Sequence, residues 1–312
     1  MFALRGVAVS LTFFVLLYCF LSALVSVSWR GLRWLRANEQ SRSDLLFLLR
    51  VFPLFASVIV TFAFVVPSFQ LLEPRSIDEG VGTMPATLGL AALLLIGYGC
   101  YRVIRAQIEA SRIVARWIEG SQALSAGGGN MLVLRSRRGA PPLLLAGMRK
   151  PRVLVSEPTV ELLTPDELQI ALRHEFVHIG SWDNLKKLLF RCCPFPALSQ
   201  LEAAWSQAAE FAADEAAVTN ASEAVNLASA LVKLSRLVPV EAAPACTVGL
   251  VTGSLAARVQ RLLAWDESRK LKAFRIPRWA AMPPILGAVF CAFLTYRPVL
   301  LMTHEFTEWL VR

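Results

Sequence analysis

The sequence predicts a mainly α-helical membrane protein with four transmembrane helices and a soluble α+β domain inserted between the third and the fourth. Of its 312 residues, 55% are apolar, and the mean hydropathy is +0.52. Soluble domains are roughly 45–50% apolar. The apolar residues gather in four segments, each about as long as the ~20 residues that cross a bilayer as a helix. The longer and more polar stretch between the last two segments predicts the soluble domain.

Each of the four predicted spans has an ordinary alternative, a helix buried in a protein core. The first also contains small residues that resemble a signal-peptide cleavage site, but its length and the basic cluster after it favour an uncleaved anchor. Pro283, Pro284 and Arg297 fall within the fourth predicted span, so its apolar pattern is weaker than that of the other three. The spans cover residues 6–29, 51–72, 82–104 and 279–302, which divides the chain into a three-span region (1–104), a soluble domain (105–277) and a final span with a short tail (278–312).

Charged residues predict the orientation, because loops rich in arginine and lysine stay on the cytoplasmic side of a membrane. The loop after the second span is acidic, with Glu73, Asp78 and Glu79 against Arg75, and is expected outside. Arginines follow the first and third spans instead (Arg30, Arg33, Arg36, Arg42; Arg102, Arg105, Arg112, Arg116). The soluble domain is therefore expected in the cytoplasm and both termini outside.

The net charge of +9 does not by itself indicate a nucleic-acid partner. The basic residues cluster beside the apolar spans, where the headgroups of the lipid bilayer are the expected partner. No nucleic-acid motif occurs among them, so no direct nucleic-acid binding is expected. The six cysteines show neither a disulfide-framework spacing nor a CxxC pair, which fits a reduced, cytoplasmic setting.

The soluble domain is expected to begin with strands and to continue as helices. Residues 102–124 predict a helix that continues out of the third span, and the glycine-rich segment 125–130 predicts a flexible break. Short apolar runs separated by glycine and proline predict strands, and longer periodic segments predict helices. The strands are expected at 131–134, 142–145 and 152–155, and the helices at 165–190, 198–219, 223–237 and 255–265.

The first of these helices contains an HExxH motif, in the segment 172–179 with the sequence LRHEFVHI. Residues four apart share one face of a helix, so His174 and His178 can bind one metal ion from the same side. Glu175 flanks that face, where its carboxylate can serve as the general base that accepts a proton from the attacking water. A lone HExxH is often a coincidence in a helix, so a third ligand is needed to support it.

A catalytic zinc site takes three protein ligands and keeps one position open. The one remaining histidine, His304, is expected beyond the fourth span, on the other side of the membrane. The third ligand should therefore be a carboxylate on a neighbouring helix. The helix predicted over 198–219 offers Glu202, Glu210, Asp214 and Glu215.

Glu210 is the predicted third ligand. It lies four residues before Asp214, on a face bordered by small alanines that permit close helix approach. Asp214 is then expected to accept a hydrogen bond from the free ring N–H of a ligand histidine. Asp183, nine residues after His174, is a second candidate for that role. The alternative is that the histidines are ordinary core or surface residues and the acids a solvated face.

Two further features have a functional and a structural interpretation. Arg258 is a candidate electrophile for the tetrahedral intermediate, because no tyrosine or third histidine falls in the soluble region. Its alternative is an arginine that pairs or packs on a helix. The run 142–155 could offer a strand edge that holds an extended peptide, or form a simple hairpin.

These segments together resemble the BlaR/MecR-type antirepressor metalloproteases, the beta-lactam-sensing membrane signal transducers of bacteria. The likeness runs from about residue 85 to the fourth span, and a more distant one extends to the CAAX-prenyl and heat-shock membrane proteases. It rests on the order of the spans and on KPRVLVS at 150–156, HEFVHIGSWDN at 174–184, EFAAD at 210–214 and RVQRLL at 258–263.

The resemblance implies a gluzincin-like protease domain on the cytoplasmic side of a bacterial inner membrane. It implies Zn2+ bound by His174, His178 and Glu210, Glu175 as the general base, and a DNA-binding repressor as the substrate. In the best-known members an external penicillin-binding sensor domain follows the fourth span. Here the sequence stops about ten residues after that span, so beta-lactam sensing by this chain itself is not expected.

The sequence thus favours a membrane-bound zinc endopeptidase that cleaves a cytoplasmic or membrane-proximal protein, with a transcriptional repressor as the substrate by family analogy. General quality control of membrane proteins is a rival substrate class. A non-enzymatic membrane transducer that kept the fold to bind a partner is the rival function. The sequence leaves the cut site, the activating signal and the oligomeric state open, and an oligomer is compatible with it.

Overall fold

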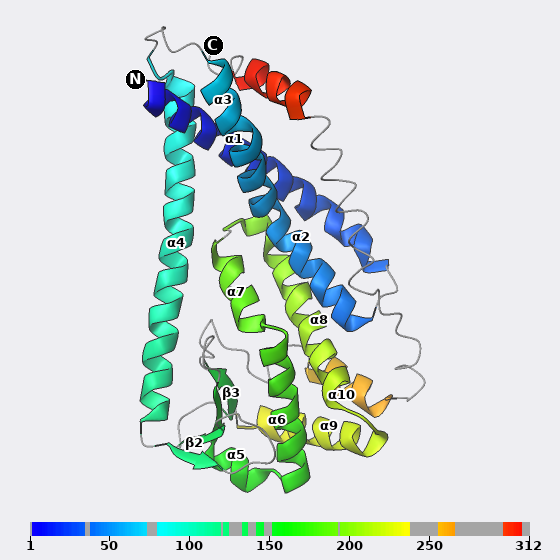
Figure 1. Ribbon diagram of the computed structural model, residues 1–312. Helices are drawn as coiled ribbons and strands as arrows, with labels where there is room; N and C mark the ends of the chain where they lie inside the picture. The colour runs from blue at the N-terminus through cyan, green and yellow to red at the C-terminus, as the bar shows by residue number, and fades with distance from the viewer. Residues whose placement is uncertain are drawn as a thin grey trace.

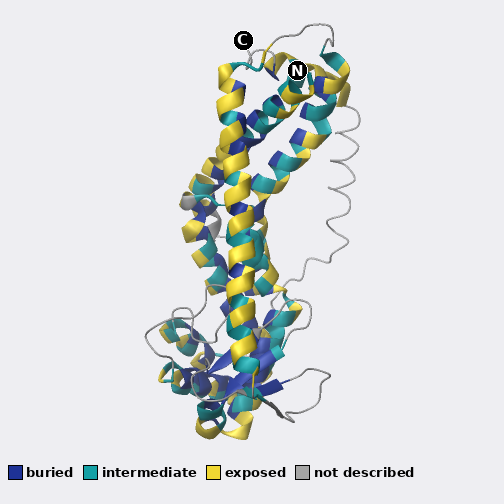
Figure 2. Ribbon diagram, turned by 90° about the vertical axis from the view of Figure 1, so that its left-hand side faces the viewer, coloured by how far each residue is buried: buried dark blue, intermediate teal, exposed yellow. Residues whose placement is uncertain are grey.

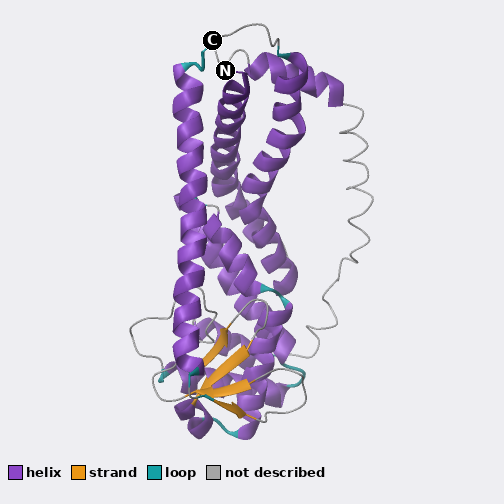
Figure 3. Cartoon of the chain, turned by 60° about the vertical axis from the view of Figure 1, so that its left-hand side comes forward, coloured by secondary structure: helices purple, strands orange, loops and turns teal. Residues whose placement is uncertain are grey.

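Helices dominate the computed structural model, which is elongated, with a small sheet at one end and the N-terminus at the other (Figure 1). Figure 3 shows the sheet among short helices at the end where the long helices stop. The described residues are 2–34, 38–73, 80–119, 121–124, 133–136, 142–146, 152–192, 194–237, 255–265 and 296–307.

Three of the helices in the described part of the chain are long and apolar enough to cross a membrane. They are α1 (Phe2–Ser28), the continuous unit of α2 (Glu39–Val60), the π-helical segment η2 (Thr61–Val65) and α3 (Val66–Leu72), and α4 (Thr83–Ile118). A 3-10 helix, η1 (Trp29–Trp34), follows α1. The structure therefore confirms apolar helices at the first three predicted spans. Figure 2 shows exposed residues along much of α4, as expected of a helix that faces lipid.

Two of these helices continue past their apolar segments. Helix α2 begins at Glu39, well before the predicted start at residue 51, because the Asn38 side chain accepts a hydrogen bond from the Ser41 amide and caps its N-terminus. Helix α4 ends at Ile118, so the prediction of a helix to residue 124 was wrong. The segment Gln122–Leu124 is instead strand β1, whose backbone pairs with a second strand.

Three predictions fall wholly or partly outside the described residues: the flexible break at 125–130, residues 131–132 of the first predicted strand, and residues 279–295 of the fourth span. Residues 296–307 are helical. The Tyr296 hydroxyl donates to the Ala63 carbonyl, and the Phe306 ring packs edge-on against Phe13 at a centroid distance of 6.0 Å. This last helix, red in Figure 1, therefore lies toward the end that carries the N-terminus.

The sheet has four strands in the order β1-β2-β4-β3. Strand β2 (Val133–Ser136) pairs in parallel with β4 (Arg152–Ser156), while β1 and β3 (Leu143–Ala146) pair antiparallel with β2 and β4. The three predicted strands are confirmed. One face, with Leu134, Leu144 and Leu154, packs against the end of α4. The other face, with Val133, Leu143, Leu145, Val153 and Val155, joins the main core of the helices.

The remaining helices build the part of the molecule that holds the HExxH motif, which we call the site end. They are α5 (Glu157–Leu162), α6 (Pro165–Gly180), α7 (Asp183–Cys192), η3 (Pro196–Leu198), α8 (Ser199–Ala217), α9 (Ala221–Ser235) and α10 (Leu255–Leu263). The single helix predicted over 165–190 was wrong, because the chain breaks at Ser181 and Trp182. Trp182 has a φ of 57°, in the left-handed region that a right-handed helix cannot continue through.

Helices α7 and α8 form a hairpin whose tip packs among the three apolar helices (Figure 1). A Cβ at Gly99 of α4 would lie 2.5 Å from the carbonyl oxygen of Cys192, so only glycine permits this approach. The Phe195 ring meets Tyr18 of α1 edge-on at 6.2 Å. The apolar helices and the helices of the soluble region therefore share a packed core.

Candidate metal centre

Helix α6 carries the HExxH motif and is fixed at its start by a capping box. The Thr164 hydroxyl accepts from the Glu167 amide, and the Glu167 carboxylate accepts from the Thr164 amide. The Glu167 carboxylate also accepts hydrogen bonds from Ser229 at 2.6 Å and Lys233 at 2.7 Å, both on α9. Local sequence and one tertiary contact thus orient the helix that presents His174 and His178.

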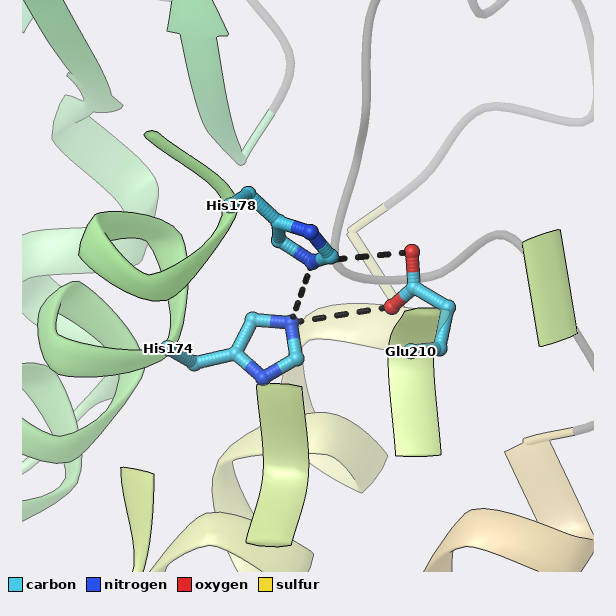
Figure 4. Close-up of side chains that lie close together, drawn as sticks. All are labelled: His174, His178 and Glu210. Atoms are coloured by element: carbon cyan, nitrogen blue, oxygen red, sulfur yellow. Dashed lines mark hydrogen bonds and ion pairs between the residues drawn. The ribbon is translucent and has the colours of Figure 1, made fainter. Parts of the chain in front are cut away.

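Three side chains from two helices converge on one point (Figure 4). The Nε2 atoms of His174 and His178 lie 3.1 Å apart. The Glu210 carboxylate, from α8, places one oxygen 3.6 Å from His174 Nε2 and the other 3.7 Å from His178 Nε2. All three side chains are buried, with at most 2% exposed. They form a group that could hold a metal ion.

The donor atoms fit the geometry of zinc. Two imidazole nitrogens at ~2.0–2.1 Å from a tetrahedral ion would lie about 3.3 Å apart, close to the 3.1 Å between His174 and His178. Two histidines and one glutamate are also a donor set of catalytic zinc sites that leaves a position open. The carboxylate of Glu210, the predicted third ligand, lies close enough to both imidazoles to bind the same ion.

Each histidine has an acid at its other ring nitrogen. Asp214 Oδ1 lies 3.0 Å from His174 Nδ1, and Asp183 Oδ2 lies 2.6 Å from His178 Nδ1. Carboxylates in these positions set the tautomer and orientation of ligand imidazoles. Asp183 reaches its ring because of the break at Trp182: five residues along an unbroken helix it would point to another face than His178.

Small residues allow α8 to bring its two acids to α6. Ala208, Ala209, Ala212, Ala213 and Ala217 are all buried along it. At its C-terminal end, the Arg173 guanidinium of α6 donates to the Ala217 carbonyl and to Glu223 of α9, each at 3.0 Å. The two site helices are thus tied together directly.

Arg258 of α10 lies against the acids of the centre. Its guanidinium donates to both oxygens of Asp214, at 2.6 and 2.8 Å, and Nη1 lies 2.8 Å from Glu210 Oε2. Only 2% of the arginine is exposed. These contacts are those of a residue that pairs with acids, the alternative given above for Arg258. They place it beside the ligand carboxylate, and its role as the electrophile stays a prediction.

The charges of these groups are strongly coupled. Burial disfavours a charge on His174, but the contacts with Asp214 and Glu210 outweigh it and raise the pKa of His174 to about 9. Burial would raise the pKa values of the two acids, yet Arg258 and His174 lower the pKa of Asp214 to about 2, and the two imidazoles and Arg258 hold the pKa of Glu210 below its usual range. A metal ion must therefore displace a proton from His174.

Glu175 is buried next to this cluster. Burial raises the pKa of its carboxyl above the ordinary range. Both carboxylate oxygens are buried and have no hydrogen-bond partner among the residues that the structure describes. Buried polar groups rarely remain unpaired unless they serve a ligand, an ion or a reaction. This carboxylate fits a base that acts on a bound water.

The structure thus brings together all seven predicted site residues. His304 lies beside Glu73, 3.9 Å away, near the opposite end of the molecule. Among the four acids of the predicted helix 198–219, Glu202 and Glu215 pair with arginines away from the imidazoles. Sequence reasoning did not find Lys186, which lies 3.6 Å from Asp183, or Arg261, which lies one turn from Arg258 on α10. Both pair with acids of α2, far away in the sequence, so no local pattern indicated them.

Comparison of the chain with protein-family models and with curated proteins found no match. The resemblance described above therefore depends on its motifs and on the order of its elements.

Proposed function

We propose that this protein is a membrane-bound zinc metalloendopeptidase. The observation that carries the proposal is the convergence of two imidazoles and one carboxylate beside a buried Glu175, whose oxygens have no hydrogen-bond partner in the described part of the chain. Three apolar helices packed onto the site helices support a membrane location. A structural cluster of the same residues would have no need of an unpaired acid, because burying one without a partner costs stability.

His174, His178 and Glu210 would hold Zn2+, which when bound acidifies a water and polarises the carbonyl of the scissile peptide bond. Glu175 takes the proton from the attacking water and delivers it to the amine that leaves. Burial raises the pKa of Glu175, which favours its carrying the proton between the two transfers. Asp214 and Asp183 hold the two imidazoles with their Nε2 atoms toward the metal position.

The substrate would be a protein on the cytoplasmic side of a bacterial inner membrane. The arginines that follow the first and third apolar helices support that orientation, with both termini outside. A repressor in a signalling pathway is the substrate that the motifs favour, and a membrane protein in quality control is the alternative. Strand β3, at the edge of the sheet, offers a backbone edge on which an extended peptide could align.

The test is the Glu175→Gln variant of the full chain, purified in detergent or nanodiscs. We expect about one zinc ion per chain in both forms, measured by elemental analysis, and loss of cleavage in the variant, compared by proteomics of cells that express either form. Glu109→Gln is the matched control, because this acid lies on the exposed surface of α4 and pairs with Arg105, away from the site. Cleavage at the wild-type rate by the Glu175 variant would refute the mechanism. A wild type without zinc would favour a non-enzymatic transducer.

A further inference from the structure

One apolar helix, α2, is joined by ion pairs to three different helices of the site end. The three charged residues lie before the predicted apolar span at 51–72. Each pair links elements that are more than 140 residues apart in the sequence. The pairs are Glu39 with Arg261 of α10, Asp44 with Lys186 of α7, and Arg50 with Glu202 of α8.

The first connection leads to His178. The Lys186 ammonium lies 3.3 Å from Asp44 and 5.4 Å from the centre of the Phe47 ring, both on α2. The same ammonium lies 3.6 Å from Oδ1 of Asp183. The other carboxylate oxygen of Asp183, Oδ2, lies 2.6 Å from Nδ1 of His178. An unbroken series of side chains therefore runs from α2 to a metal ligand.

The second connection leads to Glu210. The Arg261 guanidinium donates to Glu39 at 2.8 Å, pairs with Glu215 of α8, and stacks 4.4 Å from the centre of the Phe211 ring. Arg258 lies three residues earlier on the same helix, one turn away. Its guanidinium is the group that contacts the ligand carboxylate. Arg261 thus fixes the turn of α10 that presents Arg258.

The third pair holds these two connections in place. Arg50 is 2% exposed. Its guanidinium donates twice to Glu202, at 2.6 and 2.8 Å, and once to the carbonyl of Phe190 at 3.1 Å. The Arg50 side chain of α2 therefore contacts both α7 and α8. Two nitrogens of the buried Arg50 guanidinium meet one oxygen of Glu202, whose side chain is 37% exposed.

We propose that Lys186 and Arg261 are positioning residues, each of which ties α2 to one side of the metal centre and fixes the ligand on that side. The proposal rests on the proposed function only in that the centre binds a divalent metal. Direct partners of metal ligands typically contribute 10–100-fold to metal affinity. Lys186 and Arg261 act one contact further out, so we expect roughly threefold to tenfold.

The test uses Lys186→Met and Arg261→Met in the purified full chain, since methionine keeps the apolar stem and removes the charge. Zinc affinity is measured by competition with a chromogenic chelator, and the visible absorption of the Co2+-loaded protein reports the ligand geometry. We expect weaker zinc binding by the stated factor and a shifted Co2+ spectrum in both. Arg105→Met is the matched control, because it removes an arginine–glutamate pair on the exposed surface of α4. It should change neither reading.

Variants of α2 test whether the effect depends on that helix. Asp44→Asn and Glu39→Gln release Lys186 and Arg261 from α2 without changing either residue, and we expect most of the same loss. Each α2 change should add little to the methionine variant of its partner, because the two act through one contact. If Lys186→Met or Arg261→Met does not fold, as judged by thermal unfolding without metal, the α2 variants carry the test.

The outcomes are separable. If the wild type binds no divalent metal, the proposed function fails. If the wild type binds zinc and all four variants bind it equally well, the function stands and this inference is wrong. If only the methionine variants lose affinity, Lys186 and Arg261 act without α2, which also overturns the proposal.

Discussion

The two histidines of the metal centre are held in different ways. His174 has Asp214 behind it, and Asp214 is bound through both oxygens by Arg258, with every one of these groups at most 4% exposed. His178 has Asp183 behind it, and the next contact is Lys186, whose side chain is 14% exposed and reaches α2. The His174 side is the closed side, since its groups in direct contact are all buried and Arg261 reaches α2 only from the next turn of α10. The His178 side is the open side, since the partly exposed Lys186 itself reaches α2.

The difference indicates that the two sides of the centre contribute differently to folding stability and to metal affinity. Charges on the closed side are far from water, so removing one leaves its partners uncompensated. On the open side, Lys186 and Asp44 are partly hydrated, with 14% and 51% of their side chains exposed, so the pair between them is correspondingly weaker. We therefore expect changes around His174 to affect folding and protonation as well as metal affinity, and changes around His178 to affect mainly metal affinity.

The largest effect is expected from Arg258→Met. The change leaves Asp214 and Glu210 buried without their cation, and breaking a buried pair in this way costs about 3–5 kcal/mol. The thermal unfolding midpoint of the metal-free chain, followed by circular dichroism, should fall clearly. Lys186→Met on the open side is the comparison and should fall much less. An equal fall in both would remove the distinction between the two sides.

Asp214→Asn should change how zinc binding depends on pH. The raised pKa of His174, about 9 against an ordinary 6.5, means that this ring is protonated at pH 7. Zinc must displace the proton, so apparent affinity in the wild type should rise with pH, by up to about tenfold per unit, and level off above pH 9. Without the carboxylate that favours the charged ring, the pKa falls and the rise between pH 7 and 9 should largely disappear.

The measurement for Asp214→Asn is zinc affinity against pH with the metal buffered by a chelator. At pH 9, where the proton no longer competes, the variant should bind zinc roughly 10–100-fold more weakly, because the ring has lost its direct partner. A variant with the wild-type slope would show that Asp214 does not control the charge of His174.

Asp183→Asn should give the clearest loss of affinity with little loss of stability. The carboxylate is a direct partner of His178, so zinc binding should weaken, toward the lower end of the 10–100-fold range because Asn can still accept the ring N–H. The unfolding midpoint should move less than in Arg258→Met. A midpoint lowered as far as in that variant would contradict the proposed difference between the sides.

The smallest effect on stability is expected from a change at Trp182, in the turn between α6 and α7 that places Asp183 beside His178. Trp182 has a φ of 57° and is 61% exposed, so glycine in its place should relieve about 1 kcal/mol of backbone strain while removing little packing. The unfolding midpoint should rise slightly in Trp182→Gly and not in Trp182→Ala, which keeps the Cβ. Zinc affinity should be unchanged in both, provided that α7 keeps its start.

The sequence predicted the elements whose pattern is local. Apolar runs identify the first three long helices, and the spacing of His174, Glu175 and His178 places them on one helix face. Glu210 and Asp214 were predicted for the same reason, since a four-residue spacing beside alanines is visible without a fold. The proposal of zinc as the metal also follows from these residue types.

Features that depend on tertiary contacts were not predictable in this way. The break at Trp182 comes two residues after Gly180, but a lone glycine in a helical pattern does not fix where the helix ends. Packing of α7 against α2, through Phe190 and Phe47, compensates the strained conformation. The early start of α2 depends on Asn38 and on pairs with helices far along the chain. Strand β1 exists because β2 supplies its partners, and no pattern in three residues can indicate that.

The close approach of Gly99 to the tip of the α7–α8 hairpin fixes how far the candidate metal centre lies from this contact with α4. Helix α7 connects the contact to Asp183, and its ten residues span about 15 Å. A helix of this length acts as a rigid spacer, so the contact at Gly99 and the carboxylate beside His178 keep a constant separation.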